Sequence, residues 1–506
     1  MRKVIRLLGP VIAVAIALGV IASAAVVPAS TRSEIQLELG DLLFADERYG
    51  EAISAYLRAK DGAEPDQMIR ASAGLLRSLL LAAEFNRAYQ EALFFESLDH
   101  REAPELRTLS ADGFWGYGLF DEADRIYDEV LAEVPSHPRA RHGLARSLAA
   151  QNLHTEALVE IQAAIAVSPT DPILHHTHGM ILRGLRRYEA AAQAFEEYVA
   201  VVPKVRDTDQ LEWARAEVSF LRSFGDRVPF EMSLDEDEIV TLPFDLLNDK
   251  IVIRGRVNGS DPAELVVDTG AEKMVLSQEL AERVGVEGIT SAVSAGVGEV
   301  GMRGLEVGRV DSLILGSLEV RNVPAIIKNP PLTLAGIPRR RVPDSISPIA
   351  LGLSAVIDYR RRELALAKVL PDEPAEIELP MRVQRLAVVR GVVNQEHAKS
   401  FVVDTGGEVI SISLGTAAAL RMAPPRHIPL RVFGTSGWDQ DAFLLPGVNL
   451  AFRDIEYDNF SVVVLNLHRP SALVGFHIGG IIGHDFLSDY RVSMDLARSA
   501  LRLTRY

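Results

Sequence analysis

The sequence contains no cysteine among its 506 residues. Disulfide bonds, thiolate zinc sites, iron–sulfur clusters and cysteine nucleophiles are therefore excluded together. An excess of basic residues is also missing, because 53 Lys and Arg stand against 69 Asp and Glu and give a net charge of −16. Nucleic acids and anionic membranes bind proteins through a basic face. A chain with this net charge is not expected to present one, so we expect no nucleic-acid partner.

Compositional bias is absent as well. The 37 Gly and 26 Pro are ordinary for this length, and 48% of the residues are hydrophobic against 24% charged. Because disorder requires low hydrophobicity together with high net charge, the composition predicts a globular chain. At roughly 150 residues per domain, the length suggests about three domains.

One long apolar run lies at the N-terminus. Three basic residues precede the stretch from Leu7 to Val27, which carries no charge. A basic start before an apolar segment is typical of an export signal, and about 20 apolar residues can span a bilayer. We interpret residues 1–34 as either a cleaved signal peptide or an uncleaved single membrane anchor formed by residues 7–27. In both cases the body of the chain is expected outside the cytoplasmic membrane, in the periplasm or the extracellular space.

Residues 35–225 carry a helical pattern that recurs at a regular interval (157 − 123 = 34 and 191 − 157 = 34). A small residue recurs where two helices cross, an aromatic or Ile side chain follows four residues later, and a proline follows twelve residues after the small residue. The positions are Ala123, Ala157 and Ala191, then Tyr127, Ile161 and Phe195, then Pro135, Pro169 and Pro203. A unit from Gly40 to Pro65 also fits, and a degenerate unit lies at 70–105.

This pattern resembles the tetratricopeptide repeat, with four clear units and one poor match. The resemblance implies an all-α solenoid whose concave surface binds a protein partner, and it implies no chemistry. Because each repeat contacts mainly its neighbours, we expect residues 35–225 to fold alone.

After about residue 226 the helical period gives way to short β-branched stretches separated by glycine and proline. Two of these stretches match each other, LVVDTGAEKMVLS at 265–277 and FVVDTGGEVISIS at 401–413. Each has an apolar strand before Asp-Thr-Gly, and a Ser nine residues after the Asp can cap a short helix. We also align IALG at 349–352 with IIG at 481–483. The segment is therefore interpreted as an internal duplication.

The duplicated units resemble aspartic protease lobes, most closely the retropepsin-like bacterial group. A further match, between 355–366 and 492–503, extends the resemblance to the end of each unit. Two lobes in one chain, at 226–370 and 371–506, correspond to the tandem arrangement of pepsin-like enzymes. The expected fold is an all-α tetratricopeptide solenoid followed by an all-β bilobal aspartic protease fold.

The resemblance implies that Asp268 and Asp404 form the catalytic pair. Two carboxylates a few ångströms apart cannot both ionise easily, so they share one proton. The ionised partner takes a proton from water as that water attacks the scissile carbonyl, and the protonated partner donates to the carbonyl oxygen. A protein or peptide substrate is implied. No cofactor is expected and no metal site, since HExxH and P-loop motifs and a GxGxxG motif that follows a predicted strand are missing.

The other residues of the two motifs have supporting roles in the family. The hydroxyls of Thr269 and Thr405 are expected to brace the two loops against each other across the lobe interface. Glycine, at Gly270 and Gly406, lets backbone approach a carboxylate closely because it has no side chain. Flap hairpins that cover the substrate are expected at 294–304 and 432–440.

The sequence departs from the family in two places. Gly407 stands where Ser, Thr or Ala is usual, which removes an outer hydrogen bond to Asp404. Counted from Gly352, the first lobe is six residues shorter than the second before its last hairpin, and it is expected to lack the helix in HDFLSDYR. A longer loop, at 329–348, is expected in its place.

Two functions are compatible with these patterns. The first is an exported aspartic endopeptidase whose repeats recruit a protein substrate or partner. The second is a non-catalytic scaffold that binds protein or peptide through degenerate protease-like lobes. The intact Asp, Thr and Gly of both motifs favour the first.

Overall fold

The computed structural model describes residues 29–97, 103–202, 209–292, 305–328, 344–420, 428–434 and 437–506. The apolar run at 7–27 and the first predicted flap at 294–304 lie outside these residues. In the described part of the chain, no helix is long and apolar enough to cross a membrane. The chain divides into two compact units, one up to Ala82 and the other from Ala83 onward.

The described part of the first unit, from Ala29 onward, consists of α2 (Ala29–Ala45), α3 (Tyr49–Ala59) and α4 (Pro65–Leu81). The ring of Tyr56 on α3 fills the space beside two glycines of its neighbours. A Cβ added to Gly40 would lie 2.6 Å from that ring, and one added to Gly74 would lie 2.4 Å from it. Gly40, predicted from the repeat pattern, and Gly74 are therefore both needed for helix packing.

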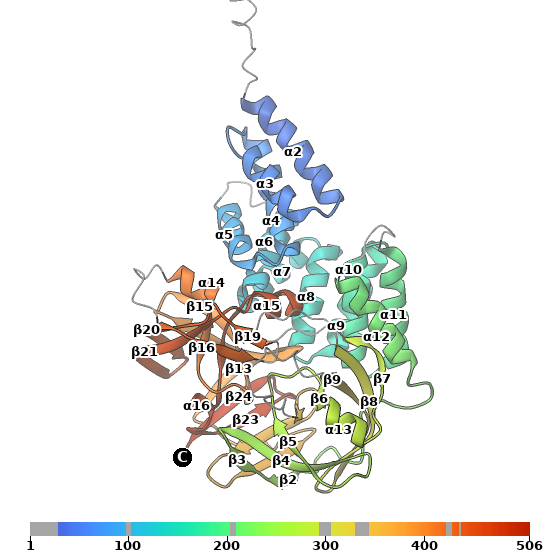
Figure 1. Cartoon of the computed structure of the whole chain (residues 1–506). Helices are drawn as coiled ribbons and strands as arrows, with labels where there is room; N and C mark the ends of the chain where they lie inside the picture. The colour runs from blue at the N-terminus through green and yellow to red at the C-terminus, as the bar shows by residue number, and fades with distance from the viewer. Residues whose placement is uncertain are drawn as a thin grey trace, which may run out of the picture. The chain divides into compact units, whose positions relative to one another are not determined.

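Regular helices continue through the first part of the second unit (Figure 1). They are α5 (Phe85–Glu96), α6 (Pro104–Tyr117), α7 (Phe120–Glu133), α8 (Pro138–Ala150), α9 (His154–Val167), α10 (Pro172–Gly184), α11 (Tyr188–Val201) and α12 (Asp209–Arg222). The rings of Tyr127 and Phe195 lie where a Cβ on Gly143 or Gly179 would stand. The predicted solenoid is confirmed. A proline also begins α6, α8 and α10, where its missing N–H costs no hydrogen bond.

Three turns of the repeats contact the β-rich part of the same unit. They contain equally spaced residues with a left-handed backbone, Gly118 (φ 88°), Asn152 (φ 61°) and Arg186 (φ 57°). The Ser400 hydroxyl donates to the Gly118 carbonyl at 2.9 Å, and the Asn152 amide donates to the Leu496 carbonyl at 3.2 Å. The Arg186 guanidinium donates to the Leu351 carbonyl at 3.3 Å. The repeat period therefore also spaces the contacts to the lobes.

The repeats and the second lobe share one hydrophobic core. Buried side chains of α6 and α7, including Trp115 and Phe120, pack with Val402, Phe476 and Ile478 of the β-rich part. The rings of Phe120 and Phe476 meet edge to face, with centroids 5.1 Å apart. Residues 35–225 are thus not a separate compact unit, and the division falls inside the repeats. This core argues against the expectation that residues 35–225 fold alone.

Two pseudo-equivalent β lobes follow (Figure 1). The first contains β1 (Glu231–Met232), β2 (Val240–Pro243), β3 (Asp245–Leu247), β4 (Lys250–Val257), β5 (Ala263–Val267), β6 (Met274–Ser277), α13 (Gln278–Arg283), β7 (Gly288–Ala292), β8 (Leu305–Leu315), β9 (Leu318–Lys328), β10 (Ser345–Ile346), β11 (Ser354–Asp358) and β12 (Glu363–Ala367). The second contains β13 (Ile377–Gln384), β14 (Leu386–Val393), β15 (His397–Val403), β16 (Ser411–Ser413), α14 (Leu414–Ala419), β17 (Ile428–Pro429), β18 (Val432–Gly434), β19 (Gly437–Asp439), β20 (Phe443–Phe452), β21 (Ile455–Leu465), α15 (His468–Val474), β22 (Ile478–Ile482), α16 (His484–Leu487), β23 (Tyr490–Asp495) and β24 (Ala500–Arg505).

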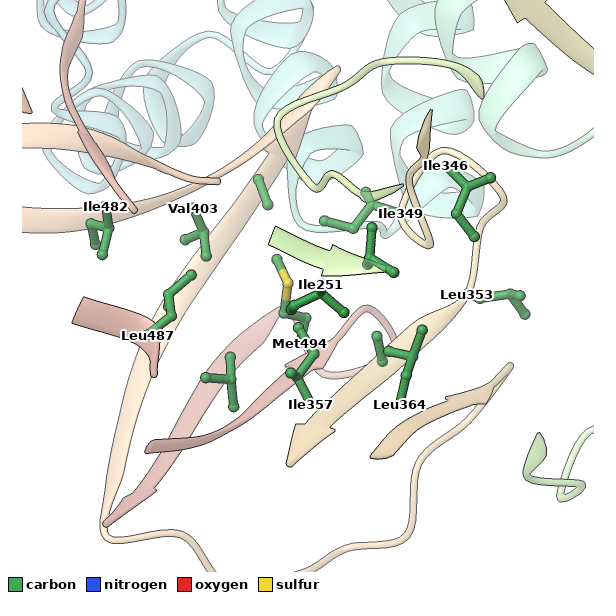
Figure 2. Close-up of a cluster of buried hydrophobic side chains, with 14 of the residues drawn as sticks. Ile251, Ile346, Ile349, Leu353, Ile357, Leu364, Val403, Ile482, Leu487 and Met494 are labelled. Atoms are coloured by element: carbon green, nitrogen blue, oxygen red, sulfur yellow. The ribbon is translucent and has the colours of Figure 1, made fainter. Parts of the chain in front are cut away.

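The lobes join through one continuous sheet with the strand order β13-β24-β23-β11-β12-β2. The last hairpin of each lobe meets the other at its centre, where Ala355 pairs with Met494 and Ile357 with Val492 in antiparallel register. Figure 2 shows part of the core around this junction, in which Ile357 and Met494 lie near Ile251. Alternating apolar residues on both hairpins therefore fix the two lobes against each other.

The strand pairing corrects the predicted alignment of the two copies. In parallel register, Ile346 pairs with Val267 in the first lobe and Ile482 pairs with Val403 in the second. The residue after each strand is Ser347 in one lobe and Gly483 in the other, at the same distance along the chain from its Asp (347 − 268 = 79 and 483 − 404 = 79). The alignment that matched IALG with IIG was therefore wrong.

The predicted shortening of the first lobe was wrong for the same reason. Strands β11 and β23 each begin seven residues after the corrected position (354 − 347 and 490 − 483). A turn at 348–352 occupies the place of α16. The long loop at 329–348 precedes this turn and does not replace the helix, and most of it lies outside the described residues.

Candidate active site

Asp268 and Asp404 occupy equivalent positions at the ends of two central strands. Asp268 follows β5 and its N–H donates to the carbonyl of Ile346 at 2.8 Å, whereas Asp404 follows β15 and donates to Ile482 at 3.0 Å. In each lobe an apolar strand stays in the sheet until the Asp, where the chain turns. The same turn geometry thus presents one carboxylate from each lobe.

The two threonines link these turns by reciprocal hydrogen bonds. The N–H of Thr269 donates to the Thr405 hydroxyl at 3.1 Å, and the N–H of Thr405 donates to the Thr269 hydroxyl at 3.0 Å. Each hydroxyl then donates across the interface at 2.7 Å, Thr269 to the Val403 carbonyl and Thr405 to the Val267 carbonyl. Both side chains are buried. The four hydrogen bonds hold the carboxylate-bearing turns in a fixed relation.

The glycine after each threonine lies against the carboxylate of the opposite lobe. A Cβ added to Gly270 would lie 2.6 Å from the Asp404 carboxylate, and one added to Gly406 would lie 2.6 Å from Asp268 Oδ1. Each glycine N–H also donates to the carboxylate of its own motif, at 3.0 Å to Asp268 and 2.8 Å to Asp404. Only glycine fits at these two positions, and the structure brings all six predicted site residues together.

The surroundings of Asp268 favour its protonated form. Burial raises the pKa of Asp268 to about 7, and the charge of Asp404 and the hydrogen bond between the two carboxyls act in the same direction. The Lys328 ammonium at the end of β9 and the Gly270 N–H act in the opposite direction. The pair titrates as a unit, so it can hold one proton near neutral pH and present one acid and one base together.

One ion pair crosses from each lobe to the turn of the other, and sequence reasoning missed both. Arg385, in the turn between β13 and β14, lies 2.8 Å from Glu272. Lys250, which begins β4, lies 3.6 Å from Glu408 and also donates to the Gly406 carbonyl at 2.5 Å. The two glutamates occupy equivalent positions, each four residues after its Asp (272 − 268 and 408 − 404). That repeated Glu was a signal in the sequence.

The serines after the two motifs cap short helices, as predicted. The Ser277 side chain accepts from the Leu280 N–H at 3.2 Å at the start of α13, and Ser413 accepts from the Thr416 N–H at 3.0 Å at the start of α14. These caps lie where β6 and β16, the strands after the two motifs, end and where α13 and α14 begin.

The second predicted flap contains a hairpin, whereas the first, at 294–304, lies outside the described residues. Strands β18 and β19 pair in antiparallel register, with Val432 opposite Asp439. The buried Asp439 carboxylate accepts from the N–H groups of Asp441 at 3.0 Å and Asn466 at 2.8 Å. These bonds fix the base of the hairpin at 432–440. In the described ranges, no group of three or more His, Asp or Glu could hold a metal ion.

Comparisons with known proteins give a match in the helical repeats and another in the first β lobe. A family model described as "gag-polyprotein putative aspartyl protease" matches residues 253–336, and a tetratricopeptide-repeat model matches residues 114–181. No curated protein matches the chain.

Parts of this chain are similar to solved structures at low identity. A thermophilic tetratricopeptide-repeat protein from Thermus thermophilus is 16% identical, with a TM-score of 0.32, over 38% of this chain and 99% of its own. The aspartic proteinase from Irpex lacteus is 13% identical, with a TM-score of 0.31, over 53% of this chain and 97% of its own. The repeat model runs from the end of α6 into α10, and the protease model begins within β4 of the first lobe. The chain therefore combines a tetratricopeptide-repeat region with an aspartic-protease-like β region.

Proposed function

We propose that this chain is an aspartic endopeptidase in which Asp268 and Asp404 are the catalytic pair. The ionised carboxylate takes a proton from a water molecule, whose oxygen bonds to the scissile carbonyl carbon. The protonated carboxyl donates to the carbonyl oxygen, and the C–N bond then breaks as the leaving nitrogen takes a proton. The products are a new carboxyl terminus and a new amino terminus.

One observation carries this proposal. Each motif glycine lies against the carboxylate of the other motif, with room for no Cβ at either position. Such mutual approach requires both copies to keep Asp-Thr-Gly intact, and a scaffold that only binds peptide would have no need of it. The raised pKa of Asp268 supports the same function, because it leaves one proton on the pair where hydrolysis needs an acid.

The repeat region is proposed to bring protein substrate or a protein partner to the lobes. Repeats of this kind bind protein segments, and in this chain helices α6 and α7 already bind the second lobe. Recruitment is therefore assigned to repeat surfaces that the second lobe leaves uncovered. The body of the chain is proposed to lie outside the cytoplasmic membrane, exported by the basic start and the apolar run at 7–27.

Cleavage of a peptide library, read by mass spectrometry between about pH 4 and pH 7, tests the enzymatic proposal. We expect cleavage that pepstatin blocks. Absence of inhibitor-sensitive cleavage at every pH would favour the non-catalytic scaffold. For location, a reporter that is active only in the cytoplasm is fused after Tyr506. Strong reporter activity would contradict export.

A further inference from the structure

Arg385 is the meeting point of three parts of the second unit. Its guanidinium pairs with Glu272 of the first lobe at 2.8 Å and donates to the Leu473 carbonyl of the second lobe at 3.1 Å. The same group lies over the ring of Trp213, with its carbon 5.5 Å from the ring centroid. Trp213 belongs to α12, the last helix of the repeat region, and it is only 7% exposed. The repeats thus contact the residue that holds the turn after Asp268.

Trp213 is itself held firmly by its neighbours. The ring of Phe195 meets it edge to face at 5.4 Å, and the ring of His176 lies 5.5 Å away. The Arg183 guanidinium lies 6.0 Å from its centroid and pairs with the buried Glu217 at 3.0 Å. An aromatic face fixed in this way can seat a planar guanidinium, which stacks on rings better than an ammonium does.

A second link leads from α12 to the same turn. Lys273 follows Glu272 directly. Burial lowers the pKa of the Lys273 ammonium, and the negative charge of Glu217 acts in the opposite direction. In return, the charge of Lys273 favours ionised Glu217. Two consecutive residues of the first-lobe turn therefore interact with groups that the repeats position.

The ion pair of the equivalent glutamate, Glu408, is more open. The Lys250 and Glu408 side chains are 24% and 69% exposed and lie 3.6 Å apart, whereas those of Arg385 and Glu272 are 10% and 18% exposed and lie 2.8 Å apart. The fold is duplicated, so this difference has no origin in the lobes' shared topology. Trp213 lies over the guanidinium of Arg385, whereas Glu408 of the other pair is mostly exposed.

We propose that Trp213 is a positioning residue for the half-site that carries Asp268, acting through Arg385 and Glu272. The repeat region is on this account a structural part of one half of the active site as well as a recruiting surface. The kinetic consequence rests on the proposed endopeptidase function. The structural consequence, a first-lobe turn that depends on α12, does not.

Hydrogen–deuterium exchange of the full chain tests the structural consequence without any activity assay. In Trp213→Leu, we expect faster exchange across residues 268–276 and unchanged exchange across 404–412, the equivalent turn of the second lobe. Trp213→Phe should restore the wild-type pattern because it keeps an aromatic face. Tyr56→Leu, which also removes a buried ring but lies in the first unit, should change neither turn.

Peptide cleavage tests the kinetic consequence. Since small misplacement of a catalytic group can reduce rates by orders of magnitude, we expect Trp213→Leu to lower kcat by about 10-fold or more while KM changes little. Arg385→Gln should have a similar effect. The variant that combines Trp213→Leu and Arg385→Gln should be no worse than Arg385→Gln alone, because both changes remove the same support of Glu272.

The outcomes separate the two proposals. If the wild type cleaves nothing, the endopeptidase function fails, and the exchange experiment still decides the role of Trp213. If Trp213→Leu changed exchange equally in the two turns, or in neither, relative to wild type, that role would be overturned. Additive losses in the double variant, or a loss in Trp213→Phe as large as that in Trp213→Leu, would overturn it as well.

Discussion

Thr269 and Thr405 each donate a backbone N–H to the other's hydroxyl, at 3.1 and 3.0 Å, across the interface of the two lobes. Replacing Thr405 with Val keeps the shape of the side chain but leaves the Thr269 N–H and the Val267 carbonyl without partners. Each buried unpaired group costs about 1–3 kcal/mol. We therefore expect Thr405→Val to lower the free energy of unfolding by about 2–5 kcal/mol, measured by urea denaturation.

Thr405→Ser is the matched control for this change because it keeps the hydroxyl. Its free energy of unfolding should fall by less than half as much. Equal losses in the two variants would mean that the methyl group, and not the hydrogen bonds, holds the turns together.

The glycines of the motifs should differ sharply in their tolerance of a side chain. A Cβ on Gly270 would lie 2.6 Å from the Asp404 carboxylate, whereas a Cβ on Gly407 would lie 3.1 Å from Asp404 Oδ2. Gly270→Ala must push the two carboxyls apart and should reduce kcat by about 100-fold or more. Gly407→Ala needs a shift of only a few tenths of an ångström and should keep most activity. Similar kcat values for the two variants would contradict this account of the site.

Stability should depend on pH through Asp268. Its pKa is raised to about 7 in the folded chain, against about 3.9 when unfolded. The stability that this carboxyl contributes is fully present below about pH 4 and is lost as pH rises through about 7. Asp268→Asn cannot ionise, so its melting temperature relative to wild type should rise between pH 4 and pH 8.

The size of this rise is expected to correspond to a free energy on the order of 1 kcal/mol or more. Asp311→Asn, at a carboxylate that is 66% exposed, serves as the control and should show a much smaller change with pH. If Asp268→Asn and wild type melt with a pH-independent difference, the carboxyl is not protonated in the folded chain at neutral pH.

A fourth prediction concerns the hydrophobic core that the repeats share with the second lobe. Phe476 is fully buried and its ring packs on Phe120 of α7. Phe476→Ala should cost about 3–5 kcal/mol and should speed hydrogen exchange in α6 and α7. Phe452→Ala removes another fully buried ring, which packs on Phe401 and Phe486 within the lobe. The control should therefore lose stability without a selective effect on α6 and α7.

Periodic and local features of the chain could be predicted from the sequence. The regular recurrence of small, aromatic and proline positions reflects contacts between neighbouring helices, so it appears directly in the residues. The two Asp-Thr-Gly motifs were found because both copies retain them. The duplication also extends further than predicted: Arg254-Gly255 and Asn258 recur as Arg390-Gly391 and Asn394, at the same offset as the two Asp (390 − 254 = 136 and 404 − 268 = 136). Both Asn residues have a left-handed backbone, each at the equivalent turn of its own lobe.

Features set by distant pairing could not be predicted in this way. Ser347 replaces the glycine of the other copy, so only the pairing of Ile346 with Val267 reveals the correct register. The partner of Glu272 is Arg385, which lies in the other lobe, and the Trp213 ring over Arg385 comes from the repeats. No local pattern connects residues separated by this much chain.

The most direct test of the central claim compares peptide cleavage by Asp268→Asn, Asp404→Asn, the double variant and a mixture of the two single variants. A pair that shares one proton within one chain predicts a large and similar loss in each single variant. The double variant should be little worse, because the two residues act as one unit, and mixing should restore nothing. Near-full activity in either single variant would contradict the two-carboxylate mechanism, and recovery on mixing would contradict pairing within one chain.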